Sequence, residues 1–336
     1  MFEYDGLTVP RQEEGAHDVR QDLAFSTGSL LGRIAGIEDG AVLLDFGGGT
    51  VSPDATGRGH GEAGLCGQLV APSLGGTPGL DEGMVSNPVE REFSLTIPEL
   101  FRQRCSRTPD RVAFRAKEYG IYQEVTWRAY RERVRHVCLG LLEIGVEPGD
   151  RVAIMGDPCP EWCYADLATQ SLGAITYGIY STSSPSQVRY LLENGGATVA
   201  VAENQEYVDK ILPLADGLPA LRKVIVADTR ALFFYKDQRL MTFGELEELG
   251  RKRSEREPGL FEELVGRGNP DDVAFLVYTS GTSGPPKPAM ISHRNCLTAL
   301  VGAFGEIFPG LGSGEHRTVS YLSMAHILER VLTGYL

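Results

Sequence analysis

The sequence of 336 residues lacks several features that assign proteins to a class. Its six cysteines form no CxxC pair and show no zinc-ligand spacing, which favours plain buried thiols over a metal site. No apolar run approaches the roughly 20 residues that span a bilayer. The acidic N-terminus, residues 1–14, has no apolar signal core. We therefore expect a protein of the reducing cytoplasm.

Positive charge is also scarce. The formal net charge is −13, and the first 90 residues contain 14 acidic residues, four arginines and no lysine. The same stretch holds 18 of the 41 glycines. Such a chain is not suited to a nucleic-acid partner or to a polybasic membrane anchor. The change in composition near residue 90 predicts two regions. A Gly-rich acidic extension over 1–92 should be poorly ordered or weakly folded, and residues 93–336 should form a folded domain.

One short segment of the extension has the form of a phosphate loop. Asp45-Phe46-Gly47-Gly48-Gly49-Thr50 follows the apolar residues 42–44, and it resembles a loop of the actin and Hsp70-type ATPases. No second loop of that kind is present in the sequence. A Gly-rich turn is therefore the favoured interpretation.

From Ser94 onward, the pattern alternates between strands and helices. Thr126 is a candidate N-cap, and Ser184 with Gln187 forms a candidate capping box. Residues 251–258 are charged and are expected to form a solvated surface segment. Strands are predicted over 151–155, 174–178, 198–202, 224–227 and 273–278, and helices over 127–144, 161–172, 185–194, 205–212, 242–250 and 293–304. This alternation predicts an α/β fold with a mostly parallel sheet, in which ligands bind beyond the carboxyl ends of the strands.

A polar loop follows the predicted strand over 273–278, where a ligand loop belongs. Its hydroxyls can donate to phosphate oxygens, its glycines allow close backbone approach, and its lysine supplies a cation. The candidate phosphate-binding residues are Thr279, Ser280, Gly281, Thr282, Ser283, Gly284 and Lys287. The GxxxxGK[ST] spacing of a Walker A loop is absent.

This loop resembles the phosphate loop of the adenylate-forming, or AMP-binding, superfamily. Further similarity lies in Thr126-Trp127 and in the GDRVA stretch at 149–153. Residues 177–183 and 320–330 resemble the long-chain and bubblegum-type fatty acyl-CoA synthetases. The resemblance covers about residues 94–336, so 93–336 is identified as a partial N-terminal domain of the acyl-CoA synthetase fold.

The resemblance implies a function that residue patterns alone do not give. Members of this family join a fatty acid to coenzyme A with ATP and Mg²⁺, releasing AMP and pyrophosphate. ATP, coenzyme A and a fatty acid are thus the implied ligands. Contact with a membrane surface is a further alternative that the resemblance allows. His326 corresponds to a histidine near the acyl and adenylate pocket. No metal-ligating residue is assigned.

Several departures from the family pattern leave alternatives open. The sequence stops at Leu336, before the adenine-binding segment and the C-terminal lysine of the family, and exposed apolar surface is expected there. Pro288 replaces the usual glycine and removes one backbone N–H near the loop. The chain is therefore either an incomplete long-chain fatty acid–CoA ligase, a non-catalytic remnant or weak nucleotide- or acyl-binding module, or another adenylating enzyme such as an aryl-CoA ligase.

Overall fold

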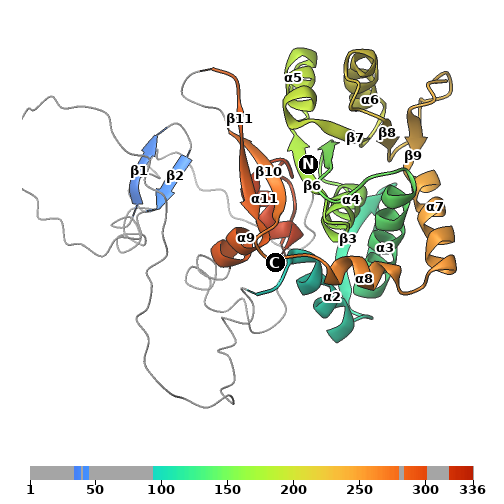
Figure 1. Cartoon of the computed structure of the whole chain (residues 1–336), viewed down its shortest axis with the longest axis vertical. Coiled ribbons are helices and arrows are strands. Elements are labelled where there is room, and N and C mark those ends of the chain that lie inside the picture. The colour runs from blue at the N-terminus through green and yellow to red at the C-terminus, as the bar shows by residue number, and fades with distance from the viewer. Residues whose placement is uncertain (1–33, 39–40, 45–93, 280–283, 301–317, 336) are drawn as a thin grey trace, which may run out of the picture. The chain divides into compact units, whose positions relative to one another are not determined.

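The computed structural model describes residues 34–38, 41–44, 94–279, 284–300 and 318–335 (Figure 1). The chain divides into two compact units, Met1–Gly79 and Leu80–Leu336. In the first unit, β1 (Ile34–Glu38) pairs with β2 (Ala41–Leu44) as an antiparallel hairpin. The phosphate-loop-like segment at 45–50 lies outside the described residues, as does most of the predicted extension.

The second unit is built on a seven-stranded sheet. Its strand order is β11-β10-β6-β5-β7-β8-β9, and the pairs from β10 to β9 are parallel, whereas β11 is antiparallel to β10. The strands are β5 (Arg151–Met155), β6 (Ile175–Ile179), β7 (Ala197–Ala202), β8 (Lys223–Val226), β9 (Leu240–Thr242), β10 (Val273–Thr279) and β11 (Lys287–Ser292). The predicted α/β fold with a mostly parallel sheet is confirmed.

Helices cover both faces of this sheet (Figure 1). Alternate residues of the strands belong to two separate clusters of buried side chains, one on each face. One cluster includes α2 (Ile97–Arg107), α3 (Trp127–Glu143), α4 (Pro160–Ser171), α7 (Phe243–Arg256), α8 (Leu260–Gly266), α9 (His293–Ala299) and α11 (Ile327–Gly334). The other includes α5 (Pro185–Gly195), α6 (Gln205–Ile211) and the adjoining 3-10 helix Leu212–Gly217. The sheet is therefore the middle of three layers.

Local sequence signals set several of the helix ends. The hydroxyl of Thr126 accepts from Ala129 N–H at the start of α3. Ser184 and Gln187 form the predicted capping box at the start of α5, with Pro185 at the first helical position. Helix α3 ends at Glu143, and Gly145, two residues later, adopts a positive φ that turns the chain away from the helix. The predicted caps at Thr126 and Ser184 are confirmed.

Other boundaries differ from the sequence-based expectation. The helix was expected to end at Gly250, before a solvated surface segment over 251–258, but α7 continues to Arg256. Residues 251–258 are mostly exposed, as expected. A capping box at Thr242 and Glu245 and ion pairs along the charged face sustain this longer helix. The prediction missed α2, α8, β9, β11 and the separate hairpin of β3 (Val112–Glu118) with β4 (Ile121–Thr126). The residues of β3, β4 and β11 are exposed or half-buried, so these strands lack a run of buried apolar residues. Helix α2 does carry a local signal, the capping box of Thr96 and Glu99, which could have revealed it.

Candidate functional site

The predicted phosphate loop connects β10 to β11 at the carboxyl edge of the parallel strands. Thr279 and Lys287 form the last register pair between the two strands, so the intervening loop leaves the sheet at that edge. Both residues are exposed. Ser280, Gly281, Thr282 and Ser283 lie outside the described residues, and their role in phosphate binding stays a prediction.

Of the two glycines in this loop, Gly284 lies within the described residues and Gly281 does not. Its φ is +93°, a backbone conformation that residues with a side chain rarely adopt. A Cβ built at this position would have no atom of the described residues within 4 Å, so among them the space beside the backbone is open. This conformation and this space fit the close approach of a phosphate group to the loop.

The charge distribution along the carboxyl edge favours an anion at β10. Asp157, Glu203 and Asp228 follow β5, β7 and β8, and burial raises the pKa of Glu203, with a further rise from the nearby Asp157 and Asp228. Segment 278–292, by contrast, contains no acidic residue. Lys287 forms no ion pair with a carboxylate in the described part of the chain. Negative charge at this edge is therefore concentrated beyond β5, β7 and β8, whereas Lys287 supplies a positive charge at the end of β10.

Pro288 lies within β11, opposite Tyr278 of β10. The backbone there is that of an edge strand, where a residue without an N–H is tolerated, and no positive φ is required. The structure thus accommodates Pro288 in the strand. Its effect on phosphate binding stays a prediction.

Helix α5 contacts both stems of the loop, which the sequence did not indicate. The Tyr190 hydroxyl donates to the carbonyl oxygen of Pro286 at 2.9 Å. The Tyr278 hydroxyl donates to Oδ1 of Asn194 at 3.0 Å. The sequence carries no local signal for these contacts, because they join residues 96 and 84 positions apart.

His326 is the N-cap of α11, and its Nδ1 accepts from Leu328 N–H at 3.2 Å. Its side chain is exposed. The preceding residue, Ala325, packs so closely on Gly178 of β6 that a Cβ on this glycine would lie 2.5 Å from the Ala325 Cα. The structure therefore places the His326 segment beside β6, the neighbour of β10, and its catalytic role stays a prediction.

A buried polar cluster holds α11 in this place. Arg330 pairs with Asp166 of α4, and the Tyr335 hydroxyl donates to Asp166 Oδ2 at 2.6 Å. The Thr176 hydroxyl of β6 donates to Asp166 Oδ1 at 2.6 Å. The Arg330 guanidinium also stacks 4.1 Å from the ring centroid of Phe275. The resemblance to the fatty acyl-CoA synthetases over 320–330 includes Arg330 but does not indicate this contact.

His293 has a structural place rather than a ligand-facing one. It is buried at the start of α9, and its Nδ1 accepts from Ile97 N–H at 3.2 Å. Burial lowers its pKa from 6.5 to about 4, against smaller opposing effects of Asp272 and Asp166. The neutral imidazole therefore joins α9 to α2.

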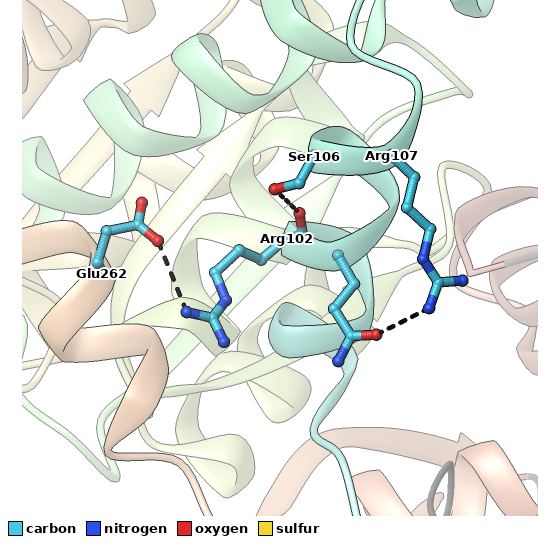
Figure 2. A pocket seen from close by; sticks show the side chains of 5 residues that line it. Arg102, Ser106, Arg107 and Glu262 are labelled. Carbon is cyan, nitrogen blue, oxygen red and sulfur yellow. Dashed lines mark hydrogen bonds and ion pairs between the residues drawn. The ribbon is translucent and has the colours of Figure 1, made fainter. Parts of the chain in front are cut away.

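The surface depression in Figure 2 lies on other elements. It is lined by Arg102, Gln103, Ser106, Arg107 and Glu262, from α2 and α8. Arg102 faces Glu262, and Arg107 donates to Gln103. Because these polar groups already have partners and the phosphate loop does not line the depression, it is not part of the candidate site.

Among the described residues, no three or more histidine, cysteine or carboxylate side chains lie closely enough together to hold a metal ion. Within the same part of the chain, no helix is long and apolar enough to cross a membrane. The described cysteines are all free, and burial raises their pKa values, as in Cys163 to about 12. Cys105, Cys138 and Cys296 are buried as predicted, whereas Cys159 and Cys163 are half-buried and Cys66 lies outside the described residues.

Comparisons with known proteins agree on one family. A family model described as AMP-binding enzyme matches residues 101–336. Long-chain-fatty-acid–CoA ligase ACSBG2 of Xenopus laevis is 30% identical over 250 residues, which cover 72% of this chain and 32% of that protein. Long-chain-fatty-acid–CoA ligase FadD15 of Mycobacterium tuberculosis is 30% identical over 226 residues, covering 67% and 36%. The chain spans about a third of the length of these curated relatives.

Solved structures share the fold. A long-chain-fatty-acid-CoA ligase (FadD1) from Archaeoglobus fulgidus matches with a TM-score of 0.59 at 16% identity, covering 72% of this chain and 45% of that one. Acetoacetyl-CoA synthetase from Streptomyces lividans matches with a TM-score of 0.56 at 22% identity, covering 71% and 36%. At these identities, the likeness concerns the fold alone.

Proposed function

This chain belongs to the AMP-binding enzyme family, and from that membership we propose that it carries the phosphate-binding part of a long-chain fatty acid–CoA ligase of the bubblegum type. The observation that carries the proposal is the loop between β10 and β11. It combines a glycine at φ +93° with an exposed lysine, at the strand end that bears no acidic residue. The identity to long-chain-fatty-acid–CoA ligases extends over 67% to 72% of the chain.

In the proposed reaction, a fatty carboxylate oxygen attacks the α-phosphorus of ATP. The bond from the α-phosphorus to the bridging oxygen breaks, and pyrophosphate leaves with the electron pair. The thiol sulfur of coenzyme A then attacks the acyl carbonyl carbon and loses its proton, and AMP leaves. The loop's part is to hold the β- and γ-phosphates, with the ammonium of Lys287 offsetting the charge of the departing pyrophosphate.

Mg²⁺, which the family reaction uses, supplies charge neutralisation to the phosphates when it is bound. The described residues offer it no cluster of carboxylates. In our proposal, Lys287 and the loop amides contact the phosphate oxygens. His326, on the β6 side of the site, is proposed to line the acyl and adenylate pocket.

Calorimetric titration with Mg-ATP tests the proposal. Lys287→Ala should weaken binding roughly 10- to 100-fold, the range for losing a hydrogen bond to a charged group. Lys252→Ala is the matched control, because Lys252 is an exposed lysine of α7 that pairs with Glu248. An unchanged affinity in Lys287→Ala, or no Mg-ATP binding by the unaltered chain, would contradict the proposal.

A carboxylate screen separates the remaining alternatives. Exchange of labelled pyrophosphate into ATP should depend on a long-chain fatty acid such as palmitate. Exchange with benzoate and not with palmitate would instead favour an aryl-CoA ligase. Mg-ATP binding without exchange for any acid would favour a nucleotide-binding module without catalysis.

A further inference from the structure

Helix α5 reaches the two stems of the phosphate loop with side chains one helical turn apart. Tyr190 bonds the Pro286 carbonyl, immediately before Lys287, and Asn194 bonds the hydroxyl of Tyr278, immediately before Thr279. Residues four apart lie on the same face of a helix. One face of α5 is therefore turned toward both ends of the loop.

Helix α5 is itself fixed to the sheet, so it can act as a reference point for the loop. Val188, Leu191 and Leu192 are buried in the core on that face of the sheet. The Tyr177 hydroxyl of β6 donates to the Leu191 carbonyl at 3.0 Å. At Gly195, a Cβ would lie 2.6 Å from the Tyr177 ring, so helix and strand are in close contact. The helix cannot shift along the strand without losing these contacts.

The β11 stem, in contrast, has little support of its own. Lys287, Pro288, Ala289 and Met290 are exposed, and β11 forms an edge of the sheet. Pro286 comes just before β11 and is not part of its ladder with β10. The hydrogen bond from Tyr190 therefore adds a contact to the stem where that ladder ends.

We propose that Tyr190 is a positioning residue for the phosphate loop: its hydroxyl fixes the peptide that joins Pro286 to Lys287 and thereby sets where the lysine meets a nucleotide phosphate. The inference rests on the proposed nucleotide-binding function. Because a peptide unit is planar, holding the Pro286 carbonyl also holds the orientation of the Lys287 N–H. The loop then loses less conformational freedom when a triphosphate binds.

The test compares Tyr190→Phe with Tyr235→Phe in the full chain. Tyr235 is a suitable control because its hydroxyl bonds Asp209 of α6 and not the loop. Tyr190→Phe should bind Mg-ATP about two- to tenfold more weakly, the range for losing one neutral hydrogen bond. Binding of inorganic tripolyphosphate, which has no adenine, should weaken by the same factor. Tyr235→Phe should match the unaltered chain for both ligands.

Amide hydrogen exchange gives a second readout that needs no nucleotide. Exchange over residues 287–292 should be faster in Tyr190→Phe and unchanged in Tyr235→Phe. Equal exchange rates in all three proteins would show that the Tyr190 hydrogen bond does not stabilise the stem. Faster exchange in Tyr190→Phe with an unchanged Mg-ATP affinity would contradict the positioning role. If the unaltered chain bound no Mg-ATP, both the proposed function and the positioning role would be contradicted. The hydrogen-exchange rates would still show whether Tyr190 stabilises the stem.

Discussion

Arg330 of α11 and Asp166 of α4 form an ion pair that is almost completely buried, with side chains 2% and 3% exposed. The two residues are 164 positions apart in the sequence. Burial disfavours the charged form of Arg330, but Asp166 and Tyr335 outweigh this effect and raise its pKa. This pair fastens α11, and with it the His326 segment, to the sheet.

Arg330→Met should destabilise the chain by about 3–5 kcal/mol, because it leaves the Asp166 carboxylate buried without its cation. The free energy of unfolding in urea measures the change. Arg294→Met is the matched control, because Arg294 pairs with Asp271 at the surface, where such pairs contribute about 0–1 kcal/mol. Equal losses in the two variants would show that the buried pair has no special importance.

Gly250→Ala should cost about 1–3 kcal/mol or more, because it forces α7 away from α3. A Cβ at Gly250 would lie 1.7 Å from the His136 carbonyl oxygen, and this backbone atom cannot move freely. Gly244→Ala, on the same helix, meets nothing within 4 Å and should be neutral or slightly stabilising. Urea unfolding of both variants checks the prediction, and a harmless Gly250→Ala would contradict the close helix contact.

His293 should make stability depend on pH. Its pKa is about 4 in the folded chain against 6.5 ordinarily, so the folded state binds fewer protons. The contribution of His293 is complete above pH 6.5 and is lost as the pH falls from 6.5 toward 4, by about 3 kcal/mol in total. The difference in unfolding free energy between the unaltered chain and His293→Gln should shrink over that window. A constant difference would mean that His293 does not stay neutral.

Gly284→Ala should weaken Mg-ATP binding by roughly tenfold through the backbone alone. Its φ of +93° is costly for alanine, by about 1–2 kcal/mol, whereas the space around it is open. Gly149→Ala is the control, since Gly149 has a φ of +82° and no described atom within 4 Å of a built Cβ. Gly149 lies just before β5, at the amino ends of the parallel strands and so away from the phosphate loop. It should lose stability without losing nucleotide affinity. Equal affinities in both variants would argue against a role for the Gly284 conformation.

Much of the fold could be predicted because its signals are local. The caps at Thr126 and Ser184 lie within three residues of the N–H groups that they bond. The position of the candidate loop followed from one apolar strand and the polar stretch after it. The extended end of α7 could not be predicted, because its helical state depends on ion pairs and packing against α3 rather than on apolar periodicity.

The sequence by itself determined the alternation of strands and helices, the place of the loop after β10, and the residues offered there to a phosphate. Only the tertiary structure decided that Tyr190 holds the loop, that Arg330 is buried against Asp166, and that His293 serves the core. These contacts join residues 96, 164 and 196 positions apart. Such pairs leave no periodicity or spacing in the chain, because they form only when packing brings separate elements together.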